Sequence, residues 1–157
     1  MKPVQQQPSI TISFFDKYDF NETNIALVQG YTGLYFMYLN DLHIPYPFLK
    51  SRLIYIGMSE SKQNSIGNRL RDHRSGQSGN FAIANYTKTY QAKFTYLSFE
   101  ILKHLGTDNV MELESFFLRD FLQVHGACPI CNNQVGTAFP ESNLFKKNIN
   151  IQWDFFV

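Results

Sequence analysis

Residues 33–39 read GLYFMYL and residues 52–57 read RLIYIG, and these two segments decide the fold. Both are short and apolar, with the aromatic and β-branched side chains that favour β-strands. The segment between them contains Pro45 and Pro47, which interrupt regular strand pairing. The pattern therefore predicts an antiparallel hairpin whose long tip is formed by residues 40–50.

A helix is predicted directly after the hairpin, in the segment NSIGNRLRDHR at residues 64–74. Asn64 or Ser65 can act as its N-cap, because both side chains accept hydrogen bonds from backbone N–H groups. Arg69 and His73 then fall on one face of the helix, where side chains four residues apart are neighbours.

The strongest helical pattern in the chain lies at residues 106–124, GTDNVMELESFFLRDFLQV. We expect Asn109 to cap this helix and Glu112 to complete a capping box with it. The apolar stripe of the helix is expected to comprise Val110, Leu113, Phe117, Phe121 and Val124. Its polar side is expected to comprise Glu112, Ser115, Arg119 and Gln123.

The remaining segments are assigned by the same criteria. Residues 93–102 alternate well enough to predict a third strand, and residues 81–91 fit a helix less clearly. The apolar tail at residues 151–157 suggests a final strand. This order of elements is typical of an α+β fold with a small central antiparallel β-sheet flanked by helices.

The chain length suits a single domain, residues 1–157. We expect its core at about residues 31–133. An N-terminal extension, residues 1–30, is expected to add a short strand and a short helix. A C-terminal extension, residues 134–157, ends in the final strand.

Composition narrows the class of protein. Hydrophobic residues make up 44% of the chain and charged residues 17%, which is a globular balance. The net charge is only +1, so any contact with nucleic acid must come from a local patch. No apolar run approaches the roughly 18 residues of a membrane span, and the N-terminus lacks the apolar stretch of a signal peptide. We therefore expect a cytoplasmic protein without a membrane partner.

One carboxylate falls on the apolar stripe of the helix at residues 106–124. Glu114 projects between Phe117 and Phe121, where an ionised carboxylate is costly unless it is paired or bound to a metal. The simpler alternative is a residue at the edge of the stripe that reaches solvent or pairs with a buried arginine. Glu112, by contrast, is expected to be a cap and a solvated charge.

Five side chains suit phosphodiester cleavage, and they are Tyr35, Tyr55, Arg69, His73 and Glu114. A carboxylate-bound metal polarises a phosphate, an arginine offsets charge on the phosphorus, and a base removes a proton from water. Each residue also has a structural alternative. The tyrosines can be ordinary sheet aromatics, the arginine a surface charge and the histidine a solvated side chain.

The order of these residues resembles the GIY-YIG nuclease family. The matching positions form two signature strands, a following serine, an arginine and a histidine on the next helix, a helical glutamate and a Pro-x-x-Asn element. They are Gly33-Leu34-Tyr35, Tyr55-Ile56-Gly57, Ser59, Arg69, His73, Glu114 and Pro129 to Asn132. Each piece alone is a weak signal, and the shared order over most of the chain makes it specific.

The resemblance implies a metal-dependent endonuclease that hydrolyses phosphodiester bonds in DNA, of a restriction or phage-related type. Tyr35 is then the general base, or it positions the attacking water. Its ordinary pKa of about 10 is too high for a base at neutral pH, so Arg69 or the metal must lower it. Tyr55 and His73 are expected to hold the phosphate and the water network.

The resemblance also implies the metal site and its support. Glu114 is the only protein ligand expected for one Mg²⁺, for which Mn²⁺ can substitute, and water and phosphate oxygens complete the octahedron. Ser59 and Asn132 are expected to support the site.

Two departures from the family bear on function. The position after the second signature strand is often Lys in the family and is Met58 here, and Lys62 is the candidate to replace it. The insertion at residues 40–50 can reach toward DNA. The missing lysine keeps a second hypothesis open, a catalytically weak or inactive GIY-YIG-like nucleic-acid-binding module.

DNA is the expected partner, and a homodimer would match a two-fold symmetric target. The candidate DNA-contacting cations are Lys62, Arg71, Arg74, Lys88 and Lys93. Charges of this kind are often only solvated, which is the alternative for each of them.

The segment His125 to Cys131 contains the pattern H-x-x-C-x-x-C. His125, Cys128 and Cys131 could supply three ligands of a zinc site, but no fourth ligand is evident nearby, although His104 can approach. We expect an ordinary turn with two reduced thiols, and we do not expect zinc there.

Overall fold

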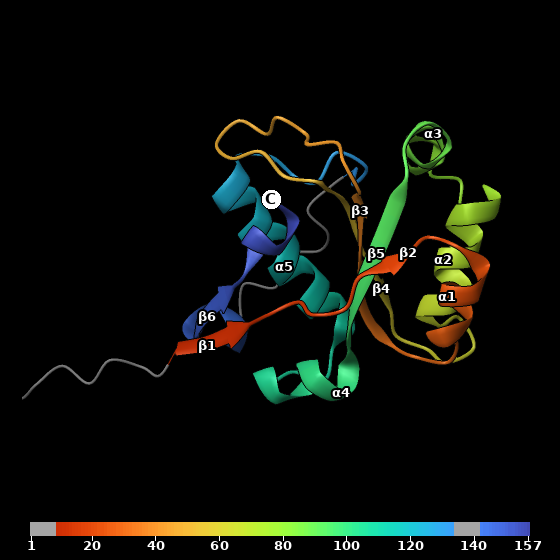
Figure 1. The fold of residues 1–157 in the computed structure, drawn as a ribbon. Helices are drawn as coiled ribbons and strands as arrows, with labels where there is room; N and C mark the ends of the chain where they lie inside the picture. The colour runs from red at the N-terminus through yellow and green to blue at the C-terminus, as the bar shows by residue number, and fades with distance from the viewer. Residues whose placement is uncertain (1–8, 134–141) are drawn as a thin grey trace, which may run out of the picture.

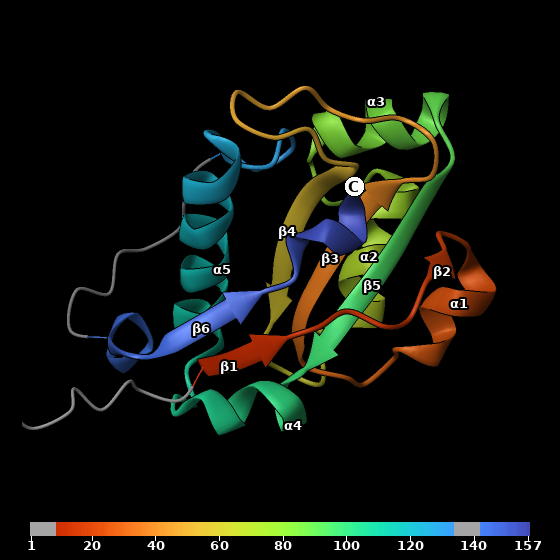
Figure 2. The same ribbon diagram turned by 60° about the vertical axis from the view of Figure 1, so that its left-hand side comes forward.

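A four-stranded antiparallel sheet lies at the centre of the computed structural model (Figures 1 and 2). The structure describes residues 9–133 and 142–157, so the outermost part of the predicted N-terminal extension and the first part of the C-terminal extension lie outside it. The strands have the order β2-β5-β3-β4. Their bounds are Tyr18–Asp19 for β2, Gly33–Leu39 for β3, Leu53–Ser59 for β4 and Ala92–Ser98 for β5. β3 and β4 pair antiparallel across the long connection at residues 40–50, which confirms the predicted hairpin.

Helices cover both faces of this sheet, which confirms the α+β class. Three helices lie on one face and α5 lies on the other (Figure 1). The bounds are Glu22–Leu27 for α1, Ile66–Ser75 for α2, Phe81–Thr89 for α3 and Val110–His125 for α5. No helix in residues 9–133 and 142–157 is both long enough and apolar enough to cross a membrane.

The two ends of the described chain pair with each other. β1, Ser9–Ile12, and β6, Asn148–Ile151, form a separate two-stranded parallel sheet. The 3-10 turn η2, Asn143–Lys146, precedes β6, and the 3-10 turn η3, Trp153–Phe156, follows it. In Figure 2 this unit lies in front of the main sheet while α2 lies behind it. Parts of the two predicted extensions, β1 and β6, therefore form one small sheet, whereas β2 belongs to the main sheet and α1 packs against α2.

The core between the main sheet and this unit is aromatic. The ring centroid of Phe36 in β3 lies 4.8 Å from that of Phe14, 5.8 Å from that of Phe117 and 6.1 Å from that of Phe156. All four side chains are buried. Aromatic rings from distant segments thus bind α5 and both chain ends to one face of the sheet.

Position 57 must be glycine because of the way its strand partner, Tyr35, packs. Gly57 pairs with Tyr35, and the Tyr35 ring lies across it. A Cβ added at Gly57 would stand 2.2 Å from Cζ of Tyr35, far inside van der Waals contact. The second signature strand therefore needs a residue without a side chain where the buried phenol crosses it.

Gly67 has a comparable reason, although glycine is unfavourable inside a helix. Ser65 caps α2 by accepting a hydrogen bond from the Asn68 backbone N–H. A Cβ at Gly67 would lie 2.9 Å from the Cα of Gln29. The glycine lets the chain after α1 pack directly against α2.

Two predicted strands end earlier than expected. The strand predicted over residues 93–102 stops at Ser98, which pairs with Gly33, the first residue of β3. Beyond Gly33 the partner strand ends, and the chain forms the short helix α4, Phe99–Leu102, followed by the 3-10 turn η1, Lys103–Leu105. The predicted strand over residues 151–157 was likewise wrong after Ile151, because its partner β1 ends at Ile12.

The predicted capping box at the start of α5 is half correct. Asn109 caps the helix by accepting from the Glu112 backbone N–H. The Glu112 carboxylate does not return to the Asn109 N–H. It accepts hydrogen bonds from the hydroxyls of Thr107 and Ser142 instead, so Glu112 is not simply a solvated charge.

Two residues of α5 lie on the opposite side from the one predicted. Ser115, assigned to the polar side, is 2% exposed, and Val124, assigned to the apolar stripe, is 40% exposed. The helix is buried on a wider arc than one stripe, since it also packs against Trp153 from the C-terminal unit. His125 takes the buried place at the end of the helix.

Candidate active site

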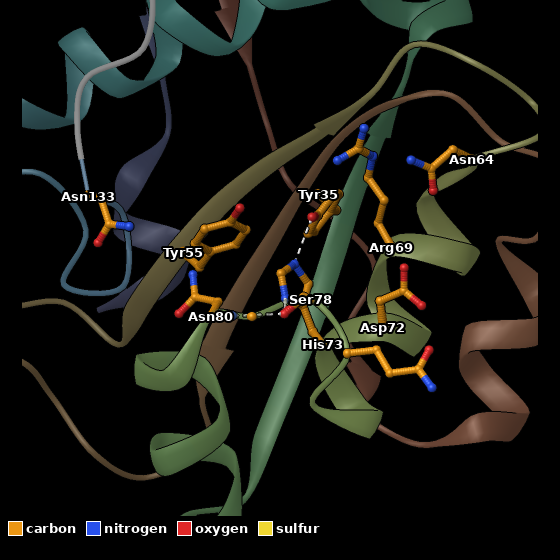
Figure 3. A pocket seen from close by; sticks show the side chains of 11 residues that line it. Tyr35, Tyr55, Asn64, Arg69, Asp72, His73, Ser78, Asn80 and Asn133 are labelled. Atoms are coloured by element: carbon orange, nitrogen blue, oxygen red, sulfur yellow. Dashed lines mark hydrogen bonds between the residues drawn. The ribbon is translucent and has the colours of Figure 1, made fainter.

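A polar cavity of about 430 Å³ opens where α2 lies over the β3–β4 hairpin. Four of the five predicted catalytic residues line it, and they are Tyr35, Tyr55, Arg69 and His73 (Figure 3). They come from three elements that are separated in sequence. The register of the hairpin and the capped start of α2 together place them around one space.

Tyr35 is the most buried of these residues, with 1% of its surface exposed. Its hydroxyl is hydrogen-bonded to Nε2 of His73 at 2.9 Å. Burial raises the pKa of Tyr35 well above its usual value of 10.0, Tyr55 raises it further, and Arg69 lowers it by less than burial raises it. The structure thus does not show the lowered phenol pKa that we expected from Arg69.

His73 is not a solvated histidine, because it is only 7% exposed. Burial lowers its pKa from 6.5 to about 4, so the imidazole is neutral at neutral pH. Its second ring nitrogen, Nδ1, is hydrogen-bonded to the hydroxyl of Ser78 at 2.8 Å. A neutral imidazole with one nitrogen on a phenol can accept a proton from that phenol.

Glu114 reaches the same region from the other side of the edge strand β4. It lines a second cavity of about 210 Å³ together with Tyr55 and the amide side chains of Asn80, Asn132 and Asn133. Burial raises the pKa of Glu114 to about 7, and the nearby Arg69 opposes this shift. Its carboxylate also raises the pKa of Tyr55, after burial itself, so the two sides of β4 form one electrostatic unit.

Arg69 belongs to the site and is not a surface charge like Arg71 or Arg74. Its Nε is buried without a hydrogen-bond partner. In the part of the chain that the structure describes, its guanidinium makes no ion pair with a carboxylate. It influences the pKa of Tyr35, Tyr55 and Glu114 together. A partly buried guanidinium without a carboxylate partner among the described residues, beside a polar cavity, is available for an anionic ligand.

The two residues expected to support the site hold its strand and loop. The Ser59 hydroxyl donates to the backbone oxygens of Ser61 and Asn64, which fixes the turn from β4 into α2. Asn132 binds both backbone groups of Ile56, with Oδ1 accepting from the N–H at 3.0 Å and Nδ2 donating to the carbonyl at 2.9 Å. Asn132 thereby pairs the open edge of β4 directly behind Tyr55.

The donor set suits a hard divalent cation. Glu114 supplies a carboxylate oxygen, a ligand type that Mg²⁺ prefers, whereas the amide oxygens of Asn80 and Asn132 already accept hydrogen bonds from backbone N–H groups. The raised pKa of Glu114 shows that no protein charge fully compensates its carboxylate. Among residues 9–133 and 142–157 no three His, Cys, Asp or Glu side chains gather as metal ligands, so such an ion would keep most of its water.

The expected DNA-contacting cations do not form one patch. Arg71 is ion-paired with Glu22 at 2.7 Å, and Lys93 is ion-paired with Asp19 at 3.0 Å. Arg74 and Lys88 line a separate cavity between α2 and α3. Lys62 is exposed and lines neither cavity of the candidate site.

His125 and the two cysteines do not converge. His125 is fully buried, with its ring stacked on Phe121 at 3.8 Å and Nδ1 bonded to the Phe121 carbonyl. Burial raises the pKa of Cys131 to about 12, and both cysteines are free thiols. Cys131 instead extends the edge of β4, through its N–H and the Ile54 carbonyl.

Sequence reasoning missed Ser78 and Asn80, which lie in the loop between α2 and α3. Both line the larger cavity (Figure 3). Asn80 caps α3 by accepting from the Ile83 N–H, and its Nδ2 donates to the Cys131 carbonyl. Only the cap was readable from the sequence, as an Asn before a weak helical pattern.

Comparisons with known proteins give no match, since no protein-family model, no curated protein and no solved structure is significantly similar to this chain.

Proposed function

We propose that this chain is a metal-dependent endonuclease that hydrolyses phosphodiester bonds in DNA. The observation that carries the proposal is the convergence of five side chains from four elements on one polar site. They are Tyr35 from β3, Tyr55 from β4, Arg69 and His73 from α2, and Glu114 from α5. Neither the core nor the helix caps require this set of groups at one place, whereas phosphodiester hydrolysis uses each of them.

Tyr35 and His73 together act as the base. The phenol keeps its own proton at neutral pH, since its ordinary pKa of 10.0 is already above neutral and burial raises it further. It can take a proton from the attacking water only if it passes its own proton on, and Nε2 of His73 lies 2.9 Å away to receive it. The neutral state of His73 leaves this nitrogen available.

Arg69 and Tyr55 hold the phosphate. The guanidinium is partly buried and free of carboxylate partners, so it can grip two phosphate oxygens at once. The Tyr55 phenol faces both cavities and can donate a hydrogen bond to a phosphate oxygen that bridges them. Binding an anion here would also offset the burial cost of the unpaired Arg69.

Glu114 is the residue that would hold the metal. A bound Mg²⁺ supplies Lewis-acid polarisation of the phosphate and stabilises the leaving oxygen. The carboxylate must be ionised to bind it, and its pKa of about 7 makes proton and metal compete near neutral pH.

Incubation of the protein with supercoiled plasmid DNA tests the proposal. We expect nicked or linear plasmid with Mg²⁺ or Mn²⁺ and none when a chelator is present. The double variant Arg69→Ala with Glu114→Gln should be inactive, which excludes a contaminating nuclease. DNA binding without cleavage by the folded parent, at any divalent ion concentration, would reject the nuclease and leave the non-catalytic binding module.

A further inference from the structure

The loop between α2 and α3 holds His73 from the side opposite Tyr35. Nδ1 of His73 lies 2.8 Å from Oγ of Ser78, and Nε2 lies 2.9 Å from the Tyr35 hydroxyl. Figure 3 shows the imidazole between these two hydroxyls. Both ring nitrogens are therefore occupied, one by a buried phenol and one by an alcohol on an exposed loop.

Ser78 is itself fixed by backbone hydrogen bonds. Its N–H donates to the Asp72 carbonyl at 3.1 Å, which closes the loop onto the last turns of α2. Its Oγ accepts from the Asn80 N–H at 3.3 Å, and Asn80 is anchored on the Cys131 carbonyl. The loop thus brings one serine hydroxyl to one nitrogen of a buried histidine and holds it there.

We propose that Ser78 is a positioning residue that holds His73 in the tautomer with the proton on Nδ1, so that Nε2 is free to accept the proton of Tyr35. The tautomer assignment stands on the geometry of the free protein, and its catalytic consequence rests on the proposed nuclease function.

The relative strengths of the two hydroxyls favour this tautomer. A phenol is a stronger hydrogen-bond donor and a weaker acceptor than an alcohol, because it is more acidic. The best pairing has Tyr35 donating to Nε2 and Nδ1–H donating to Ser78. The other tautomer would make the phenol the acceptor and the alcohol the donor. The Asn80 N–H that already points at Oγ does not block the Nδ1–H, since a hydroxyl oxygen has two lone pairs.

The groups that face His73 leave the imidazole neutral, so the tautomer is well defined. Tyr35 in β3 and Tyr55 in β4 contact its ring, with centroid distances of 5.9 and 5.1 Å. Asp72 and Arg69 on α2 shift its pKa in opposite directions, and burial dominates both.

The tautomer of His73 decides whether Tyr35 can pass its proton to Nε2. The attacking water forms a bond to phosphorus and gives its proton to the Tyr35 oxygen, and Tyr35 gives its own proton to Nε2. The bond from phosphorus to the leaving oxygen breaks, that oxygen keeps the electron pair and takes a proton from solvent, and His73 becomes an imidazolium. It then loses a proton through Nδ1 to Ser78 and solvent. If Nε2 already carried a proton, the phenol proton could not pass to His73.

The tautomer can be read directly by long-range ¹H–¹⁵N correlation spectra of the parent protein at neutral pH. The chain has four histidines, so His73→Gln identifies the signal. We expect the Nδ1–H form in the parent and in Ser78→Thr, and a shift toward the Nε2–H form in Ser78→Ala. An Nε2–H imidazole in the parent overturns the assignment even if Ser78→Ala fails to fold. Retention of Nδ1–H in a folded Ser78→Ala overturns it too.

Cleavage kinetics test the consequence. Ser78→Ala should lower the single-turnover rate about 10-fold or more while DNA affinity stays unchanged, as expected when a supporting hydrogen bond is lost. Ser78→Thr should cleave at nearly the parent rate. Ser75→Ala is the matched control, because among the described residues the Ser75 hydroxyl bonds the Asp72 carbonyl and the Gln77 N–H and is not hydrogen-bonded to His73. An unchanged rate in Ser78→Ala overturns the positioning role. The spectra identify the tautomer of His73 even if the parent does not cleave DNA. The tautomer assignment and the proposed nuclease function can therefore be rejected independently.

Discussion

At the scale of single residues, burial favours the uncharged form of Tyr35, His73 and Glu114. Tyr35 stays protonated, His73 stays neutral, and Glu114 keeps a proton up to about pH 7. All three side chains pay desolvation costs that a purely structural arrangement would avoid. Removing their polar groups should therefore affect activity much more than stability.

Tyr35→Phe should keep the fold and remove most of the reaction. The ring still lies across Gly57, and only the hydroxyl on His73 is lost. We expect the single-turnover cleavage rate to fall by about 100-fold or more, with little change in thermal stability. Tyr38→Phe is the control on the same strand, since the Tyr38 hydroxyl is buried and has no hydrogen-bond partner in residues 9–133 and 142–157. A rate within a few-fold of the parent would make Tyr35 a packing residue.

Arg69→Lys should be almost as damaging to cleavage as Arg69→Ala. Lysine keeps the charge but loses the planar group that grips two phosphate oxygens. Arg71→Ala serves as the control, because that side chain is ion-paired with Glu22 at the surface. Its loss should cost at most about 1 kcal/mol of stability and leave turnover unchanged. Normal turnover of Arg69→Lys would show that Arg69 contributes only its positive charge.

Glu114→Gln should stabilise the metal-free protein, and more at pH 8 than at pH 5. The folded pKa of about 7 lies above the ordinary 4.5, so the folded state binds more protons than the unfolded state between these values. Parent stability therefore falls as pH rises through that window, and the glutamine variant lacks this fall. Thermal unfolding in chelator measures the difference, with Glu112→Gln as control.

Mg²⁺ at pH 8 should then raise the Tm of the parent and not that of Glu114→Gln, because only the parent retains the carboxylate ligand. If the stability of both proteins depended on pH in the same way, Glu114 would not be a buried carboxyl with a raised pKa. An equal rise in the Tm of both proteins with Mg²⁺ would show that the metal binds at a site other than Glu114.

At the scale of elements, the site depends on an edge strand that is not left open. β4 is the last strand of the main sheet, and the segment after α5 pairs its free edge. Asn132 bonds both backbone groups of Ile56, and Cys131 bonds the carbonyl of Ile54. This pairing fixes Tyr55, which lies between Ile54 and Ile56, relative to both cavities.

Asn132→Ala should destabilise the protein by about 1–3 kcal/mol, because the two backbone groups of Ile56 lose their partners. Cleavage should fall as well, since Tyr55 is no longer held by a paired strand. Asn133→Ala is the matched control for stability alone, because the neighbouring side chain is exposed but also lines the candidate site. Chemical denaturation and plasmid cleavage measure the two effects. Equal stability of both variants would mean that Asn132 does not support β4.

At the scale of the whole molecule, the chain ends complete the core. β1 and β6 pair in parallel and bring Trp153 and Phe156 onto the sheet face that carries Phe36. Trp153 also donates its indole N–H to Asp120 of α5 at 2.8 Å. The C-terminal unit thus packs on α5 and holds this helix, which carries Glu114, against the edge of the sheet.

Trp153→Ala should cost about 3–5 kcal/mol of unfolding free energy, the usual effect of removing a buried tryptophan. The matched control is Phe15→Ala, because Phe15 is 82% exposed and should change stability by less than about 0.5 kcal/mol. Urea denaturation followed by circular dichroism measures both. Similar midpoints for the two variants would show that the C-terminal unit is not part of the cooperative core.

The sequence by itself determined the local elements. The strand Gly33–Leu39 has the predicted bounds, Ser65 is the one of the two candidate residues that caps α2, and Asn109 caps α5 as expected. Strand propensity and capping depend on neighbouring residues, so they can be read from one segment at a time. The grouping of the candidate catalytic residues rested on a resemblance, and the structure brings those five side chains to one site.

Tertiary structure alone decided the features that depend on which segments meet. β5 ends at Ser98 because its partner begins at Gly33, and Ser115 of α5 is buried although it falls outside the predicted apolar stripe. Arg71 and Lys93 do not form the expected DNA-binding patch, because acidic residues of distant elements form ion pairs with them. The raised pKa of Tyr35 and the contact between Ser78 and His73 likewise arise only on folding, since burial and long-range contacts are properties of the packed chain and not of any segment within it.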